Sequence, residues 1–185
     1  MRIVLASKSP RRRELLSELF DKFEIIVADC DESLPEGTPA IRGVELLSVK
    51  KGEAVLPLCE GALIISSDTL VELDGEKLGK PRDGEHARQM LRNLSGRTHN
   101  VHTGVAVHYR GKCISGVATT SVKFKELTDD QISAYVDSGE PMDKAGAYGI
   151  QGGAGEFVEY ISGDFDTVVG LSLKLTKKLI DEVLK

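Results

Sequence analysis

The chain has 185 residues, 41% hydrophobic and 29% charged, a balance that supports a packed core and excludes a disordered protein. Its 24 basic and 29 acidic residues give a formal net charge of −5, so any anion site must come from local basic residues and nucleic acid is not an expected partner. No apolar run approaches the ~20 residues that cross a bilayer, and the N-terminus lacks the pattern of a signal peptide. We therefore expect a cytoplasmic protein with a single domain, residues 1–185, and no membrane partner.

The three cysteines, Cys30, Cys59 and Cys113, are odd in number and far apart in the sequence. They suggest neither a disulfide framework nor a C-x-x-C zinc pair, which fits a reducing compartment. We interpret them as small, buried apolar residues.

Strands and helices alternate along the chain, beginning with the apolar run Ile3–Ala6. Ser9 and Pro10 suit the N-cap and the first position of a helix, and Asp74-Gly75 predicts a tight hairpin turn. In chain order we expect strand 3–6, a helix from residue 10, strand 23–27, helix 40–55, strand 63–73 interrupted by polar residues at 66–69, strand 76–80, helix 84–94, strands 98–109 and 112–124, helix 128–139, strand 157–161 and helix 172–184. This order predicts an α/β fold with a mixed, twisted sheet and flanking helices.

Basic residues gather where the first strand gives way to a helix. In the segment Ser7–Arg13, three arginines occupy the first helical turn, where they oppose the helix dipole unless an anion pairs with them. An anion there would interact with free backbone N–H groups and with guanidinium groups together. The segment alone is equally compatible with a solvated basic turn, and the chain contains no P-loop motif.

Asp68 lies within an otherwise apolar strand, where an ionised carboxylate is costly unless it is paired or binds a metal. This position favours a general base or a metal ligand, and the alternative is a strand-end aspartate bonded to local backbone. Asp29, Asp31 and Glu32 form an acidic patch after the second strand. The patch suits Mg²⁺ if it lies near Asp68, and is otherwise a solvated turn.

Two lysines, Lys51 and Lys80, could join the N-terminal arginines in neutralising a triphosphate, although each alone fits an ordinary surface. The glycine-rich segment 143–153 permits close backbone approach. Within it, Gln151 carries both a donor and an acceptor and could bind the edge of a base.

Three histidines on one predicted strand, His99, His102 and His108, could suggest a metal site. Their spacing is too wide for one ion, so we interpret them as ordinary surface or hydrogen-bonded residues.

Taken together and in order, these segments resemble the signature motifs of the Maf family of nucleotide pyrophosphatases. The matching segments are 5–12, 67–69 with 78–83, 90–96 with His99, 140–152 and 168–171. The longest, Glu140–Gly152, is highly specific, and the resemblance covers nearly the whole chain.

The resemblance implies a mixed α/β fold similar to that of inosine triphosphatase, with two lobes around a central cleft and often a homodimer. It implies hydrolysis of a nucleoside triphosphate to the monophosphate and pyrophosphate with Mg²⁺ or Mn²⁺. The pair Asp68-Thr69 is similar to the branch of the family that acts on dTTP and UTP.

The resemblance also implies residue roles. Asp68 would be the catalytic proton acceptor and, with Glu32, would hold the metal. Arg11, Thr69 and Gln151 would govern substrate choice. The remaining residues expected to bind the substrate are Ser7, Ser9, Arg12, Lys51 and Lys80.

Some positions depart from the family pattern. Ser67 replaces the usual alanine, and Ser172 replaces the usual proline, which predicts a looser start to the last helix. Lys50 adjoins Lys51, so the role of that lysine could belong to either residue.

Two alternative functions are a regulator of septum formation that binds nucleotide without significant turnover, and a pyrophosphatase for purine or modified nucleotides. Every version of the pyrophosphatase hypothesis requires Arg11 and Asp68 to face a common triphosphate pocket.

Overall fold

The computed structural model describes residues 1–185 as two compact units. Unit 1 contains residues 1–69, 103–118 and 170–185, and unit 2 contains residues 70–102 and 119–169. The chain passes from one unit to the other four times, three times within long strands and once between residues 169 and 170. No helix combines the length and the apolar character that crossing a membrane would require.

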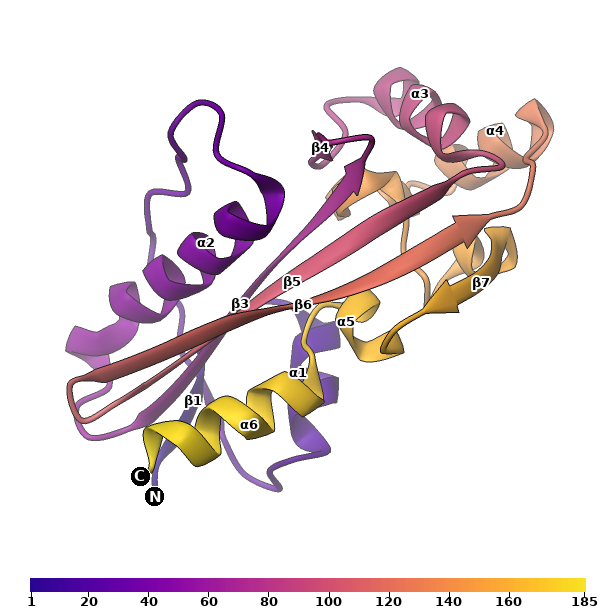
Figure 1. The fold of residues 1–185 in the computed structure, drawn as a ribbon. Helices are drawn as coiled ribbons and strands as arrows, with labels where there is room; N and C mark the ends of the chain where they lie inside the picture. The colour runs from indigo at the N-terminus through magenta and orange to yellow at the C-terminus, as the bar shows by residue number, and fades with distance from the viewer. The chain divides into compact units, whose positions relative to one another are not determined.

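The sheet has the strand order β2-β1-β3-β5-β6-β7, with β4 paired to β3 (Figure 1). The pairing of β1 with β2 and β3 is parallel, whereas β4 with β3 and β7 with β6 are antiparallel. The predicted α/β fold with a mixed sheet is therefore confirmed. The strands are β1 (Ile3–Leu5), β2 (Glu24–Ile25), β3 (Leu63–Leu73), β4 (Glu76–Leu78), β5 (Thr98–Tyr109), β6 (Lys112–Phe124) and β7 (Val158–Ser162).

Most helices begin and end close to the predicted residues, because their capping residues are recognisable in the sequence. Asp83 and Thr128 cap α3 and α4 with their side chains, and Thr128 forms the expected capping box with Gln131. The helices are α1 (Pro10–Ser17), α2 (Ala40–Val55), α3 (Gly84–Leu94), α4 (Asp129–Asp137), α5 (Phe165–Val169) and α6 (Leu173–Val183).

Two features differ from the sequence predictions. β3 is one continuous strand, so the polar residues 66–69 do not interrupt it. The short helix α5 was not expected, nor were the 3₁₀ turns η1 (Leu56–Leu58), η2 (Glu140–Asp143), η3 (Ala145–Ala147) and η4 (Gly153–Phe157). Such short elements lack a full period of apolar residues, so pattern alone does not reveal them.

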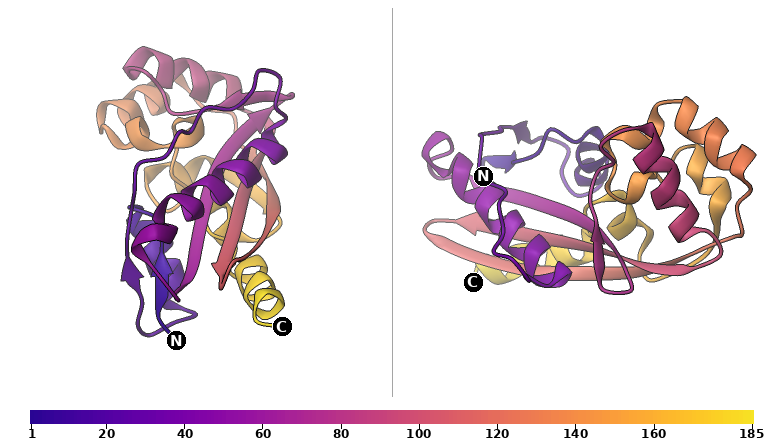
Figure 2. Two further views of the ribbon diagram at one scale, coloured as in Figure 1. Left: turned by 90° about the vertical axis from the view of Figure 1, so that its left-hand side faces the viewer. Right: turned by 90° about the horizontal axis from the view of Figure 1, so that it is seen from above.

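Within unit 1, α2 and α6 cover opposite faces of the sheet (Figure 2). On β6, the hydroxyl of Ser115 donates to Glu45 of α2 at 2.9 Å, whereas the next residue, Gly116, lies against Leu175 of α6. Successive residues of a strand point to opposite faces, so the two contacts place one helix on each side.

The close approach of α2 to the sheet depends on glycine. A Cβ at Gly104 of β5 would lie 2.3 Å from the carbonyl oxygen of Val44, and one at Gly52 would lie 2.3 Å from Nε2 of His108. Both distances are shorter than atoms tolerate, and the carbonyl of Val44 cannot rotate away because it belongs to the helix backbone.

We expect Gly104→Ala to lower the free energy of unfolding by about 1–3 kcal/mol, because α2 must move off β5 to admit a methyl group. Urea unfolding measures this change. Gly79→Ala is the control: its Cβ would have no atom within 4 Å. Equal stabilities of the two variants would contradict the packing described here.

The core of unit 2 surrounds Phe124, whose ring packs edge-on against His99, Tyr148 and Phe157. The helices α3 and α4 lie side by side in this unit (Figure 1). His99 is 2% exposed, and its Nε2 lies 2.8 Å from the hydroxyl of Tyr148. Burial lowers the pKa of His99 to about 4, because the apolar surroundings disfavour the imidazolium.

This burial predicts that acid destabilises the protein. The folded pKa of His99 lies below the unfolded value of about 6.5, so protons bind the unfolded chain first as the pH falls from about 6.5 towards 4. At pH 5 we expect a loss on the order of 1–2 kcal/mol from this residue. Urea unfolding at pH 7 and pH 5 tests it, and His99→Gln should reduce the difference between the two pH values. If the free energy of unfolding of His99→Gln falls between pH 7 and pH 5 as much as that of the unchanged protein, other groups cause the acid destabilisation.

Candidate active site

The N-terminal turn of unit 1 forms as the sequence predicts. Ser9 caps α1, its side chain accepting the N–H of Arg12 at 3.4 Å, and Pro10 occupies the first helical turn. The hydroxyl of Ser7, which is buried, accepts the N–H of Ser9 at 3.2 Å. Both serines therefore shape the turn and hold Arg11 and Arg12 at the start of the helix.

Arg12 connects this turn to β3 and to the C-terminal segment. Its Nε donates to the carbonyl oxygen of Gly170 at 2.8 Å and its Nη2 to the hydroxyl of Thr69 at 3.1 Å. A weaker contact joins Nη1 to Ser7 at 3.4 Å. The guanidinium is thus fixed by groups from three separate stretches of the chain.

Asp68 is paired with Lys51 of α2. The ammonium of Lys51 lies 2.5 Å from Oδ1 of Asp68 and 3.3 Å from Oε2 of Glu32. The Asp68 side chain is 13% exposed and that of Glu32 is 60% exposed. One end of the acidic patch therefore lies beside Asp68, as the hypothesis of a shared site requires, whereas Asp31 instead bonds to Ser33.

The arginine turn and Asp68 also influence one another electrostatically. Burial lowers the pKa of Arg12, and the charge of Arg11 acts in the same direction, whereas Asp68 and Glu32 raise it. These four charged groups therefore lie within one electrostatic environment. The structure brings together the residues of unit 1 that the sequence proposed: Ser7, Ser9, Arg11, Arg12, Glu32, Lys51, Asp68 and Thr69.

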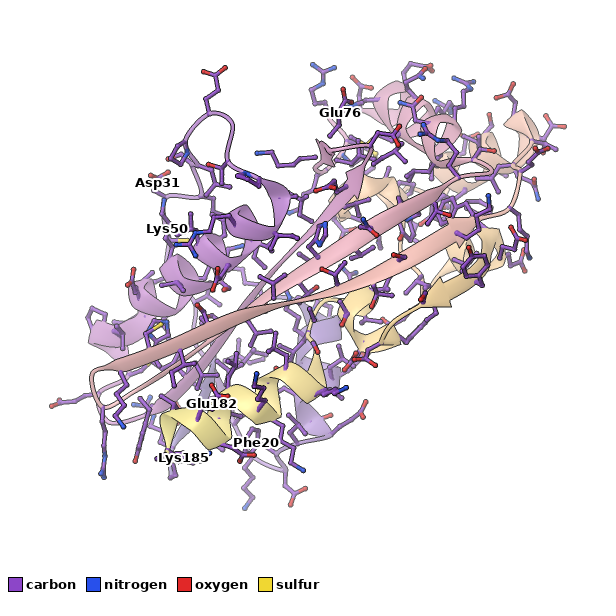
Figure 3. The ribbon with its side chains drawn as sticks, in the orientation of Figure 1. Phe20, Asp31, Lys50, Glu76, Glu182 and Lys185 are labelled. Carbon is purple, nitrogen blue, oxygen red and sulfur yellow. The ribbon has the colours of Figure 1, made fainter.

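The structure distinguishes Lys51 from its neighbour. Lys50 points towards Asp31 (Figure 3), with its ammonium 3.2 Å from the carbonyl oxygen of Asp31 and 2.9 Å from that of Ser33. Lys51 alone of the two contacts Asp68. A lysine directed at the acidic loop supports that loop, whereas Lys51 is directed at the candidate site.

Lys80 and Gln151 belong to unit 2. Lys80 is exposed and follows Gly79, whose carbonyl oxygen accepts the N–H of Gly146 at 3.0 Å. Gln151 is exposed in the glycine-rich segment. Their participation in a site with the residues of unit 1 stays a prediction.

The three histidines were interpreted as surface or hydrogen-bonded residues, and none of them lies on the surface. His99, His102 and His108 are each at most 3% exposed. His102 Nδ1 lies 2.8 Å from the hydroxyl of Thr119. Both faces of β5 are covered, which the alternation of polar and apolar residues did not indicate.

The interpretation of the cysteines was partly wrong. Cys59 is buried, whereas Cys30 is half-buried and Cys113 is exposed, and all three are free thiols. Cys113 lies at the start of β6, immediately after the hairpin turn, where little of the unit covers it.

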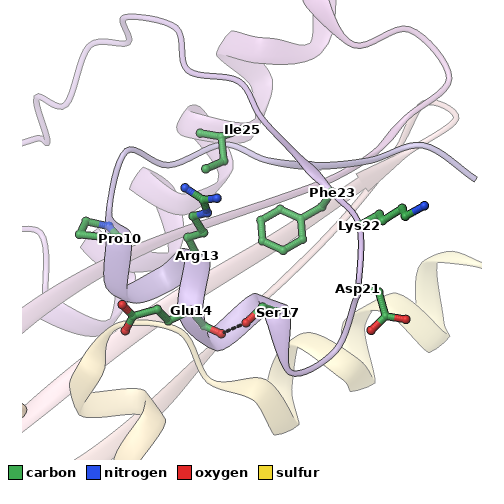
Figure 4. Close-up of a pocket in the computed structure, with 8 residues that line it drawn as sticks. All are labelled: Pro10, Arg13, Glu14, Ser17, Asp21, Lys22, Phe23 and Ile25. Carbon is green, nitrogen blue, oxygen red and sulfur yellow. Dashed lines mark hydrogen bonds between the residues drawn. The ribbon is translucent and has the colours of Figure 1, made fainter.

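A surface hollow lies beside α1 and β2, between Pro10, Arg13, Phe23 and Ile25 (Figure 4). None of the residues proposed for the site lines it. Asp21, Lys22 and Glu14 border it with mixed charges, which would not favour a triphosphate.

The donor set of unit 1 suits a hard divalent cation. No group of three or more His, Cys, Asp or Glu side chains is arranged to hold a metal ion, but Mg²⁺ commonly binds through one or two carboxylates together with substrate phosphates. Asp68 and Glu32 already converge on a single cation, the ammonium of Lys51. The two carboxylates are therefore able to share a positive charge.

Sequence reasoning missed the part played by the C-terminal segment. The carbonyl oxygen of Gly170 accepts hydrogen bonds from Arg12 and from the buried Ser67, the latter at 2.9 Å. The φ of Gly170 is +129°, and a Cβ there would lie 3.3 Å from Nε of Arg12. The glycine in the segment 168–171 was the signal that a backbone group approaches the site closely. Ser172 does not loosen α6, because its hydroxyl caps the helix by accepting the N–H of Leu175.

With this geometry established, the chain can be compared with known proteins. The family described as Maf-like protein matches residues 2–183. This chain is a member of the Maf family.

Several relatives match nearly the whole of this chain. The dTTP/UTP pyrophosphatase of Thermococcus gammatolerans is 50% identical over 96% of this chain and 94% of its own length. Proteins of the same name from Chromobacterium violaceum and Escherichia coli are each 48% identical, over 98% and 96% of this chain and 94% and 91% of their own lengths. The similarity therefore extends across both units.

Among solved structures, the Ham1 protein of Staphylococcus aureus matches with a TM-score of 0.50 and 18% sequence identity. The match covers 67% of this chain and 72% of that chain. At this identity the likeness concerns the fold alone, and it agrees with the predicted α/β class.

The contacts of Arg12 lead to a prediction for Arg12→Lys. A lysine has one compact donor group and cannot contact Gly170 and Thr69 as the planar guanidinium does, so hydrogen bonds that join α1 to these two residues are lost. We expect the free energy of unfolding to fall by about 1–3 kcal/mol in urea titrations. Arg13→Lys, at the exposed next position, should change stability little. Similar losses in both variants would contradict the anchoring role of Arg12.

Proposed function

We propose that this chain is a dTTP/UTP pyrophosphatase, which hydrolyses these nucleotides to the monophosphate and pyrophosphate, and that both units act as one domain. The observation that carries the proposal is the convergence of Arg12, Lys51, Glu32 and Asp68 in unit 1. The relatives named dTTP/UTP pyrophosphatase, 48–50% identical over nearly the full length, support the choice of substrate.

In this proposal Asp68 is the general base. It orients a water molecule and removes its proton as the water attacks the α-phosphorus, and the bond to the pyrophosphate leaving group breaks. The close contact with Lys51 orients the carboxylate, which extends from the continuous strand β3. The base therefore has a defined position before the substrate binds.

The cationic groups serve the leaving group. Pyrophosphate gains negative charge as the anhydride bond breaks, and fixed cations stabilise that charge more than they stabilise the ground state. Arg11, Arg12 and Lys51 would supply this stabilisation from unit 1, and Lys80 from unit 2. Ser7 and Ser9 hold the turn that places the arginines.

A divalent cation, Mg²⁺ or Mn²⁺, would bind Glu32 and Asp68 and would neutralise phosphate charge when bound. In this structure Lys51 pairs with both carboxylates. When the substrate and the metal bind, its side chain would turn so that the ammonium pairs with a phosphate oxygen instead. The side chain has four methylene groups and retains the freedom for that movement.

Substrate choice is assigned to Arg11, Thr69 and Gln151. Thr69 is fixed by Arg12 and by Thr103, whose hydroxyl lies 3.0 Å from its own. We also propose a cytoplasmic location and a homodimer. Two alternatives are regulation of septum formation without turnover and a preference for purine or modified nucleotides. Pyrophosphate release measured with a panel of common and modified triphosphates distinguishes them.

We expect Asp68→Asn to reduce turnover of dTTP and UTP by on the order of 10²–10⁴-fold, because an amide cannot accept the proton of water. Release of pyrophosphate in the presence of Mg²⁺ measures this loss. Asp21→Asn, a change of the same type at an exposed position of unit 1, should keep full activity. Full turnover by Asp68→Asn would exclude Asp68 as the base, and no pyrophosphate release by the unchanged protein would exclude the function.

A further inference from the structure

The glycine-rich segment of unit 2 forms a turn that exposes Gln151. The N–H of Gly152 donates to the carbonyl oxygen of Gly149 at 3.1 Å, which closes a four-residue turn with Gln151 in its third position. Ile150 packs against the core of the unit, whereas Gln151 is exposed. One side of the turn is therefore anchored, and the other presents an amide.

Two side chains outside the turn hold both of its ends. The N–H of Gly149 donates to the hydroxyl of Tyr135 at 3.0 Å, and the N–H of Gly153 donates to Oε2 of Glu140 at 3.2 Å. The Tyr135 hydroxyl donates in turn to Oε1 of Glu140 at 3.0 Å. We call this Glu140–Tyr135 pair the turn clamp, because one carboxylate is linked to both ends of the turn.

The turn clamp explains why glycine is needed here. A Cβ at Gly152 would lie 2.0 Å from Oε1 of Glu140, and one at Gly149 would lie 2.6 Å from Cε of Lys144. Lys144 is itself fixed, because its ammonium donates to the carbonyl oxygen of Glu140 at 2.6 Å. The glycines let the backbone lie directly on these side chains, so the position of the turn is set by Glu140.

Both polar groups of the clamp are well suited to a fixed geometry. Tyr135 is 7% exposed, and burial raises the pKa of its hydroxyl, so it stays a donor at neutral pH. Hydrogen bonds to an ionised carboxylate are stronger than those between neutral groups. Glu140 accepts two hydrogen bonds, one from the hydroxyl of Tyr135 and one from the N–H of Gly153.

We propose that Glu140 is a positioning residue for base selection: through the turn clamp it fixes the backbone that presents the Gln151 amide to the nucleobase. This inference rests on the proposed function, in which Gln151 contributes to substrate choice. Thymine and uracil present a carbonyl acceptor at C4 and an N–H donor at N3, whereas cytosine presents an amino donor at C4 and an acceptor at N3. A glutamine amide can pair with either pattern, so discrimination depends on the position from which its side chain reaches the base, and the turn clamp fixes the backbone at that position.

The test is Glu140→Gln, which keeps the shape of the side chain but removes its charge and leaves one oxygen in place of two for the Tyr135 hydroxyl and the N–H of Gly153. We expect the ratio of kcat/KM for dTTP to that for dCTP to fall by on the order of tenfold, the usual effect of one hydrogen bond. The value of kcat for dTTP should change much less. A role in stability alone would scale both nucleotides equally and leave the ratio unchanged.

Three further variants complete the experiment. Tyr135→Phe removes the hydroxyl between Gly149 and Glu140 and should also lower the ratio of kcat/KM for dTTP to that for dCTP. Gln151→Ala removes the amide itself and gives the ratio expected when its contribution is lost completely. Glu159→Gln, at an exposed position of β7, is the matched control and should keep the original ratio.

Amide exchange gives a readout that needs no nucleotide. The N–H of Gly153 should exchange faster in Glu140→Gln, because a neutral amide with a single oxygen is a weaker acceptor than the carboxylate that it replaces. Unchanged selectivity in both clamp variants, or in Gln151→Ala, would overturn the inference. Absence of pyrophosphate release from the unchanged protein would instead overturn the proposed function, so the two failures are distinguishable.

Discussion

The arrangement of unit 1 depends on how β3 accommodates a carboxylate in its interior. Asp68 follows five buried residues on a continuous strand, and an unpaired charge at such a position would cost several kcal/mol. The ammonium of Lys51, 2.5 Å away, compensates it and also contacts Glu32. Because Lys51 belongs to α2, this ion pair requires α2 to lie close to the sheet, which Gly52 and Gly104 permit.

The need to compensate a charge that is partly removed from water also explains the position of Arg12. Arg12 is half-buried, so its guanidinium needs protein acceptors where water is excluded, and it finds them in Thr69 and in the carbonyl oxygen of Gly170. Three remote stretches of chain must therefore meet for Arg12 to be stable. A site with such fixed charges is organised before the substrate binds, which is the condition for stabilising charge that develops during a reaction.

The two units use glycine for a shared purpose, to let backbone lie against a functional side chain. In unit 1, Gly170 brings its carbonyl group to Arg12, and in unit 2, Gly152 lies on the carboxylate of Glu140. These glycines do not mark flexible loops, since each backbone segment is held by hydrogen bonds. The glycine-rich sequence signature therefore reflects close packing around polar side chains.

The sequence by itself determined the elements whose signals are local: the caps at Ser9, Asp83 and Thr128, the hairpin at Asp74-Gly75 and the bounds of α2 and α3. It also identified Asp68 as unusual, because the apolar residues around this charge are its neighbours in the sequence. Only the tertiary structure decided that Lys51 and not Lys50 contacts Asp68, that β5 is buried on both faces, and that Gly170 and Glu140 hold other residues in place. Those outcomes depend on contacts between residues up to 158 positions apart, which leave no periodicity or cap in the sequence.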